Sequence, residues 1–266
     1  MFFNRKKTSV MGNAPAVAAP QPKTITYHIP GGTYSNLAKV VLDAPHTLIA
    51  GTTGCGKTTF LRSVIKALLV KESPNEARLI LIDPKRIELN DLADLPHTMR
   101  YTDTRSGAVD ALDKAIAIME DRYDKMSKAG AKLWDGEKVY VIIDELADLM
   151  LSDYANDIKK KLQRLLQLGR SAKIVVICGT QCPNRKVIPA ELVCNFPCRF
   201  GLRCLNQIES RQIVNMKGCE TLPEHGEAYV INGCTADRYK LPFVTEEDLA
   251  PLLSYWKSPA AVTYGY

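Results

Sequence analysis

Residues 51–58 read Gly-Thr-Thr-Gly-Cys-Gly-Lys-Thr and fit the pattern G-x-x-x-x-G-K-[ST]. In this pattern, the Walker A motif, glycines let backbone N–H groups turn inward around the phosphates of a nucleotide. The helix that follows presents the positive end of its dipole to the same anion. Lys57 can reach the β- and γ-phosphates, and Thr58 can coordinate Mg²⁺. The alternative is an ordinary glycine-rich turn between a strand and a helix.

The residues on both sides of this motif fit the strand and the helix that a phosphate loop needs. Residues 46–51 form an apolar run that predicts a buried strand, and residues 57–71 carry apolar side chains at helical spacing. This context favours the phosphate loop over the ordinary turn. We therefore predict that ATP binds at this loop, on Gly51, Thr52, Thr53, Gly54, Cys55, Gly56, Lys57, Thr58 and Thr59.

A second motif, Asp144 followed by Glu145, comes directly after the apolar run 139–143. An acidic pair at this point is the Walker B pattern. Asp144 would hold the Mg²⁺ shell, usually through water, and Glu145 would polarise the attacking water as general base. Such a pair is also common at a solvated strand end, but the Walker A motif upstream favours the catalytic interpretation. An adjacent Glu is more typical of an ATP hydrolase than of a nucleotide kinase.

Strands and helices alternate along the rest of the chain. Continuous apolar runs, rather than strict alternation, predict strands that are buried on both faces. With helices between them, they indicate an α/β fold with a mainly parallel central sheet flanked by helices. Beyond the Walker A region, the predicted strands span residues 24–29, 77–83, 138–144, 173–180, 198–204 and 226–232, and the predicted helices span residues 106–128, 153–169 and about 206–217.

A polar pair, Thr180-Gln181, follows the predicted strand 173–180. In a parallel sheet, the carboxyl ends of the strands line the ligand crevice. Gln181 could touch the γ-phosphate there and respond to its hydrolysis. The alternative is a pair that only caps its strand.

Composition narrows the class of protein. The chain has 266 residues, of which 46% are hydrophobic and 24% are charged, which excludes a wholly disordered chain, a fibrous repeat and a coiled coil. No stretch approaches the ~18 apolar residues of a membrane span, and no apolar run follows the basic N-terminus. We therefore expect a cytoplasmic location. The net charge of +6 permits a nucleic-acid partner without requiring one.

The chain contains eight cysteines, which we expect to be reduced thiols in that compartment. Two pairs, Cys178/Cys182 and Cys194/Cys198, have CxxxC spacing, which can occur in zinc sites. The simpler alternative is that these are small buried hydrophobic side chains, and it is favoured because Cys178 lies at the end of a predicted buried strand.

Five runs of residues, in this order and spacing, resemble one family of ATPases. They are TLIAGTTGCGKTTFLRSVIKALL (47–69), LILIDPKRIELNDLADLPH (79–97), ALDKAIAIMEDRYDKM (111–126), VYVIIDELADLM (139–150) and CGTQCP (178–183). The sequence resembles the motor domain of FtsK/SpoIIIE DNA translocases over about residues 37–232. Within these runs, IDPK (82–85), MEDRY (119–123) and DELADLM (144–150) distinguish this family from other P-loop ATPases.

The resemblance implies a RecA-like P-loop NTPase that works as a ring, usually a hexamer, around double-stranded DNA, with ATP and Mg²⁺ bound between subunits. Arg170 falls where the family places an arginine that reaches the ATP of a neighbouring subunit, although a surface arginine near a helix C-terminus would also be favoured there. The residues that match the family's ATPase positions are Lys57, Thr58, Asp144, Glu145 and Gln181.

Two departures from the family concern the pore that contacts DNA, and the first of them could instead affect support of the nucleotide sensor. Cys182 stands where the family usually has an arginine, and the segment 127–138 is shorter than in larger relatives. Ring translocases hold the phosphate backbone with Lys and Arg, which gives affinity without sequence choice. Arg185, Lys186 and Lys132 are our candidates for this role, and an ordinary solvated basic side chain is the alternative for each.

The expected domain organisation is a flexible tail at 1–22, a motor domain at 23–245 that begins with a lead-in segment at 23–45, and a C-terminal tail at 246–266. The family's membrane-spanning N-terminus and C-terminal winged helix are not expected, so a separate membrane anchor or DNA-reading protein would supply them. The leading hypothesis is an ATP-driven translocase of double-stranded DNA. The alternatives are a secretion-type ATPase that moves polypeptide and a non-motor, ATP-dependent switch or adaptor.

Overall fold

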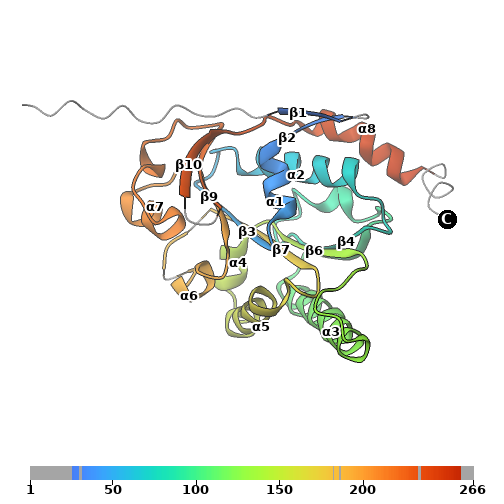
Figure 1. Ribbon diagram of the computed structural model, residues 1–266. Helices are drawn as coiled ribbons and strands as arrows, with labels where there is room; N and C mark the ends of the chain where they lie inside the picture. The colour runs from blue at the N-terminus through green and yellow to red at the C-terminus, as the bar shows by residue number, and fades with distance from the viewer. Residues whose placement is uncertain (1–25, 30–31, 182, 186, 233–234, 259–266) are drawn as a thin grey trace, which may run out of the picture.

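The computed structural model describes residues 26–29, 32–181, 183–185, 187–232 and 235–258. Within these residues, eight strands form one sheet in the order β10-β9-β8-β3-β7-β6-β4-β5 (Figure 1). The strands from β8 to β5 in this order pair in parallel, and β9 and β10 add an antiparallel edge. The bounds are β3 (His46–Ala50), β4 (Ala77–Ile82), β5 (Thr98–Thr102), β6 (Lys138–Ile143), β7 (Ile174–Thr180), β8 (Cys198–Gly201), β9 (Glu227–Asn232) and β10 (Thr235–Lys240).

Helices cover both faces of this sheet, which confirms the predicted α/β fold (Figure 1). The helices are α1 (Asn36–Asp43), α2 (Lys57–Lys71), α3 (Arg105–Ala129), α4 (Leu146–Met150), α5 (Ala155–Leu168), α6 (Ala190–Val193), α7 (Gln207–Val214) and α8 (Glu246–Lys257), with short 3₁₀ turns at η1 (Asn90–Leu92) and η2 (Cys219–Thr221). A separate hairpin of β1 (Thr26–Ile29) and β2 (Gly32–Ser35) precedes α1.

Two hydrophobic clusters, one on each face, hold the layers together. On one face, α3, α4 and α5 pack against alternate side chains of the sheet, such as Val141 of β6. On the other face, α1, α2 and α8 pack against the side chains between them, such as Tyr140 and Ile142. Because successive residues of a strand point to opposite faces, a strand buried on both faces must be apolar throughout. This is why the apolar runs in the sequence predicted β3, β4, β6 and β7 correctly.

The order of the strands brings the two sequence motifs together. β7 lies between β3 and β6, with Ile49 opposite Gly179 and Ile143 opposite Cys178. The carboxyl ends of these parallel strands therefore meet at one side of the sheet, which we call the carboxyl edge, and their starts form the amino edge. A Cβ atom at Gly179 would lie 2.3 Å from the carbonyl oxygen of Asp144, so only glycine permits this close approach.

Several elements differ from the sequence expectation. The structure contains β5, β10, α4, α6 and α8, which the apolar pattern did not predict. Within the expected tail 246–266, α8 begins with a capping box between Thr245 and Asp248, and Trp256 Nε1 donates a hydrogen bond to the Leu69 carbonyl oxygen (3.0 Å). The expected tail at 1–22 lies outside the described residues. In the described part of the chain, no helix combines the length and apolar character that crossing a membrane requires.

Candidate nucleotide site

The backbone of the Walker A loop (51–58) has the conformation that its glycines allow. Gly54 and Gly56 have φ angles of 81° and 97°, in the left-handed region that other residues rarely adopt. The N–H of Gly51 donates to the Thr180 carbonyl oxygen (3.1 Å). A Cβ atom at Gly51 would lie 2.7 Å from both Cys55 Sγ and Leu202 Cβ, so this position has no room for a side chain.

Neighbouring loops fix this Walker A loop from outside. The N–H and hydroxyl of Thr52 donate to the Arg203 carbonyl oxygen, at 2.8 Å and 3.2 Å. The exposed His225 contacts the Gly54 carbonyl oxygen through Nδ1. Both contacts come from segments more than a hundred residues downstream, and neither was predicted from the sequence.

Lys57 is buried among the acidic residues of the second motif. Its Nζ donates to the Asp144 carbonyl oxygen (2.8 Å) and lies 3.4 Å from Asp144 Oδ1 and 3.9 Å from Glu145 Oε2. Burial raises the pKa of Asp144, and the positive charge of Lys57 opposes that shift. The ammonium group is therefore placed to bridge these carboxylates and a phosphate that enters the Walker A loop.

Asp144 and Glu145 are only 1% and 3% exposed, so they are not a solvated strand end. Glu145 Oε1 accepts from the N–H groups of Gln181 (3.0 Å) and Ala147 (3.2 Å). Glu145 Oε2 accepts from Lys85 Nζ at 3.1 Å. The carboxylate is thus held at the carboxyl edge by the end of β7, the start of α4 and the loop after β4.

Gln181 connects the two motifs. Its backbone N–H reaches Glu145, and its side-chain Oε1 accepts from the Thr53 hydroxyl at 3.0 Å. The preceding Thr180 is fully buried, and its carbonyl oxygen accepts from Gly51. The polar pair therefore contacts both the phosphate loop and the acidic motif rather than only capping its strand.

The oxygens around Thr58 suit a small divalent cation. The Thr58 hydroxyl donates to Glu88 Oε1 (3.0 Å), and Glu88 Oε2 accepts from Arg62 Nη2 (3.2 Å). Burial raises the pKa of Glu88, and the charge of Asp144 adds to that shift. Thr58, Asp144 and Glu88 offer only oxygen ligands, which Mg²⁺ prefers. The described residues hold no group of three or more His, Cys, Asp or Glu placed for a metal, so the ion would depend on phosphate and water as well.

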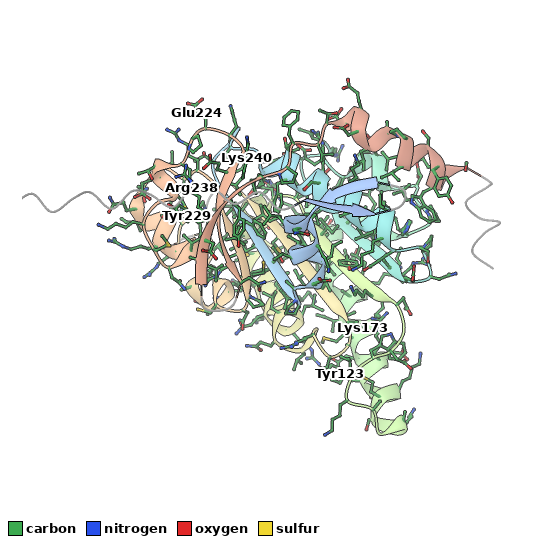
Figure 2. The ribbon with its side chains drawn as sticks, turned by 45° about the horizontal axis from the view of Figure 1, so that its top comes forward. Tyr123, Lys173, Glu224, Tyr229, Arg238 and Lys240 are labelled. Carbon is green, nitrogen blue, oxygen red and sulfur yellow. The ribbon has the colours of Figure 1, made fainter. Side chains whose placement is uncertain are left out.

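Arg170 does not reach the nucleotide site of its own chain. It is exposed in the turn between α5 and β7, at the amino edge, whereas Gln181 follows β7 at the carboxyl edge. In Figure 2, Lys173 marks the amino edge, and Glu224, next to the histidine that contacts the Walker A loop, lies on the opposite side of the molecule. The structure therefore does not bring Arg170 together with the other predicted site residues.

The two candidate DNA-contacting residues that the structure describes, Lys132 and Arg185, lie apart. Lys132 is exposed in the loop after α3, which is tied to the amino edge by a hydrogen bond from the Trp134 N–H to the Ser171 carbonyl oxygen (2.9 Å). Arg185 is exposed beyond the end of β7, at the carboxyl edge. Lys186 and Cys182 lie outside the described residues, as does any zinc site that needs Cys182.

Two residues that carry no role in the sequence prediction, Lys85 and Glu88, stand at the centre of this site. Both follow β4, which pairs with β6 so that Ile82 lies opposite Ile143. The loop after β4 therefore reaches the acidic motif after β6. The signal for Lys85 was present in the family run IDPK, but only the strand order shows what it touches.

Sequence comparison finds a matching family model and relatives that are named DNA translocases. A model described as the FtsK/SpoIIIE family matches residues 32–138. The DNA translocase FtsK of Agrobacterium fabrum is 34% identical and covers 86% of this chain, and that of Listeria monocytogenes is 32% identical and covers 83%. This chain covers 30% and 32% of those two relatives, so it spans about a third of their length.

Solved structures share the fold. The conjugation coupling protein TcpA of pCW3, solved in monomer form with ATPγS, has a TM-score of 0.69 at 21% identity. The match covers 87% of this chain and 69% of the TcpA chain. The cytoplasmic domain of the type VII secretion ATPase EccC from Thermomonospora curvata has a TM-score of 0.66 at 22% identity. That match covers 80% of this chain and 28% of the EccC chain. The family-model match and the FtsK relatives, together with the Walker A loop and the buried acidic pair, show that the chain belongs to the FtsK/SpoIIIE family of P-loop ATPases.

Proposed function

We propose that this chain is an ATP-hydrolysing motor that moves double-stranded DNA through a ring of identical copies. The observation that carries the proposal is the position of Glu145. Its carboxylate is buried and accepts from the Gln181 N–H, and its Oε2 lies 3.9 Å from Nζ of Lys57 in the Walker A loop. A carboxylate at this point can polarise water for attack on a nucleotide phosphate. The relatives named DNA translocase support DNA as the substance that is moved.

Each residue of the site has a role in this proposal. The backbone of the Walker A loop binds the phosphates, and Lys57 moves from Asp144 towards them. Gln181 fixes Glu145 and responds to the state of the phosphate through Thr53. Thr58 and Asp144 would hold Mg²⁺, with Glu88 orienting the Thr58 hydroxyl. When bound, Mg²⁺ would offset the negative charge of the phosphates.

The assembly in this proposal follows from the two edges of the sheet. A ring, which we propose to be a hexamer, would place the amino edge of one copy against the carboxyl edge of the next. Arg170 would then stabilise charge on the phosphoryl group bound by its neighbour. Arg185, Lys186 and Lys132 would contact the DNA backbone. The motor unit would include α8, because that helix packs on α2.

The test is the steady-state ATPase rate of the purified chain without DNA, with long duplex DNA and with single strands. Lys57→Ala serves as the blank, because it removes the ammonium group from the phosphate site. We expect stimulation by duplex DNA at low salt that the variant loses. Stimulation by unfolded polypeptide instead would indicate a secretion-type motor, and tight ATP binding without turnover would indicate a switch. Either result would overturn the proposal.

A further inference from the structure

Three donors hold the carboxylate of Glu145 in this structure. A carboxylate offers about four lone-pair sites. The Gln181 N–H approaches both oxygens, at 3.0 Å and 3.2 Å, the Ala147 N–H approaches Oε1 at 3.2 Å, and Lys85 Nζ approaches Oε2 at 3.1 Å. Water that approaches Oε2 therefore competes with Lys85 for that oxygen.

Of these donors, Lys85 is the one that can leave. The donors on Gln181 and Ala147 are backbone N–H groups at the end of β7 and in α4. They cannot move unless the backbone of these elements moves. Lys85 is a side chain on a flexible stem, and 34% of it is exposed. Departure of Lys85 opens Oε2 while the two backbone donors keep the carboxylate in place.

The loop that carries Lys85 is strained at one residue and exposed to solvent. Arg86 has a φ of 61°, a strained value for a residue other than glycine. It is held by a hydrogen bond from its N–H to the Asp83 carbonyl oxygen (3.0 Å) and by an ion pair with Asp103 (2.9 Å). The Arg86 and Ile87 side chains are 66% and 70% exposed, so a macromolecule could reach them without unfolding the site.

We infer that Lys85 is a positioning residue that restrains Glu145. The ion pair occupies Oε2 in the resting chain, and movement of the Lys85 side chain releases the carboxylate for hydrolysis when DNA is engaged. Lys85 thus lowers the rate of ATP hydrolysis in the absence of DNA. This inference rests on the proposed ATPase function.

The first test compares Lys85→Met with the unaltered chain. Methionine keeps an unbranched side chain that is one atom shorter and removes the charge. We expect the DNA-free kcat to rise severalfold, the KM for ATP to stay unchanged, and the ratio of DNA-stimulated to DNA-free rates to fall. Lys85→Arg should restore the low DNA-free rate. A DNA-free kcat equal to or below that of the unaltered chain would overturn the inference.

Lys125→Met is the matched control, because Lys125 is an exposed lysine that pairs with Asp121 on α3, away from the site. Its kinetic constants should equal those of the unaltered chain. A rise in this control similar to that in Lys85→Met would show a general effect of lost charge and would also overturn the inference.

A second test does not depend on turnover. Acylation of lysine amines, quantified by mass spectrometry, should modify Lys85 more rapidly in Glu145→Gln than in the unaltered chain, with Lys125 as the internal reference. Equal Lys85 reactivity in the two proteins would overturn the inference. If neither the unaltered chain nor Lys85→Met exceeds the Lys57→Ala blank, the proposed function fails, and labelling alone decides whether Lys85 restrains Glu145.

Discussion

A buried cationic side chain lies at each edge of the sheet, and the two have different kinds of partner. At the amino edge, Arg122 is 2% exposed, donates to the Ala172 carbonyl oxygen and to Glu137 Oε1 (both 2.7 Å), and stacks on Trp134. At the carboxyl edge, Lys57 is 5% exposed and faces carboxylates beside an open glycine loop. A guanidinium group with fixed partners joins segments of the fold, whereas a mobile ammonium group can exchange partners.

The difference shows that burial of a charge does not by itself mark a functional site. Arg122 belongs to the family run MEDRY, yet its contacts join α3 to the segments around Glu137 and Ala172. Lys57 differs from Arg122 because it contacts Asp144 and Glu145 beside the phosphate loop. A bound nucleotide and cation would change these contacts. Substitutions at the carboxyl edge should therefore alter ATP turnover, and substitutions at the amino edge should alter stability.

The largest effect is expected for Glu145→Gln at the carboxyl edge. Loss of the general base should lower kcat about 1,000-fold, or about 4 kcal/mol in the barrier, because a neutral amide cannot take a proton from water. ATP affinity and thermal stability should be nearly unchanged. Steady-state kinetics and the binding of a fluorescent ATP analogue measure both quantities. A variant with near-normal kcat would show that this carboxylate is not the base.

Arg122→Met at the amino edge should act on stability instead. It leaves the buried Ala172 carbonyl oxygen without its donor and removes a stacked guanidinium group, at a cost of about 3 kcal/mol in the free energy of unfolding. Urea unfolding measures this loss, with Lys125→Met on the same helix as control. ATP turnover per folded molecule should not change. A selective loss of turnover with unchanged stability would contradict the distinction between the edges.

His46, at the start of β3, makes the amino edge sensitive to acid. Burial lowers the pKa of His46 from 6.5 to about 4, and its Nδ1 accepts from the Val176 N–H (3.2 Å), which requires the neutral ring. Because the folded pKa is depressed, this contribution to stability is present above pH 6.5 and is lost as the pH falls towards 4. The loss reaches about 2 kcal/mol at pH 5.

Replacement of this histidine by a residue that does not titrate measures the effect. The difference in unfolding free energy between His46→Gln and the unaltered chain should shift by that amount between pH 7 and pH 5, in favour of the variant. Comparison of the two proteins at each pH removes the contribution of the other titrating groups. A difference that does not vary with pH would show that His46 is not held neutral.

The smallest effect is expected for Glu88→Gln at the carboxyl edge. Glutamine can still accept from the Thr58 hydroxyl but lacks the charge near the cation site. The Mg²⁺ concentration needed for half-maximal ATPase rate should rise about fivefold, or about 1 kcal/mol, with kcat at saturating Mg²⁺ largely kept. Glu76→Gln, an exposed carboxylate at the other end of β4, is the control. An unchanged Mg²⁺ requirement would place Glu88 outside the cation site.

Elements with a strong local signal were predicted well. Helix α2 spans Lys57–Lys71 as expected, and α3 spans Arg105–Ala129 against the expected 106–128. Elements with a weak signal were missed. Strand β5, Thr-Met-Arg-Tyr-Thr, lies at an edge of the sheet and is mostly half-exposed, so it has no continuous apolar run. The α4 helix has only five residues, too few to show a helical period.

Local sequence features specify the chemistry of the carboxyl edge. A glycine pattern followed by Lys57 and Thr58, and an acidic pair after an apolar run, are local features, since backbone freedom and charge depend on residue type. Which groups meet these motifs is visible only in the folded chain. Lys85 reaches Glu145 because β4 lies beside β6, and Arg170 faces away from its own site because β7 runs between the two edges. Strand order depends on packing between distant segments, which local sequence does not encode.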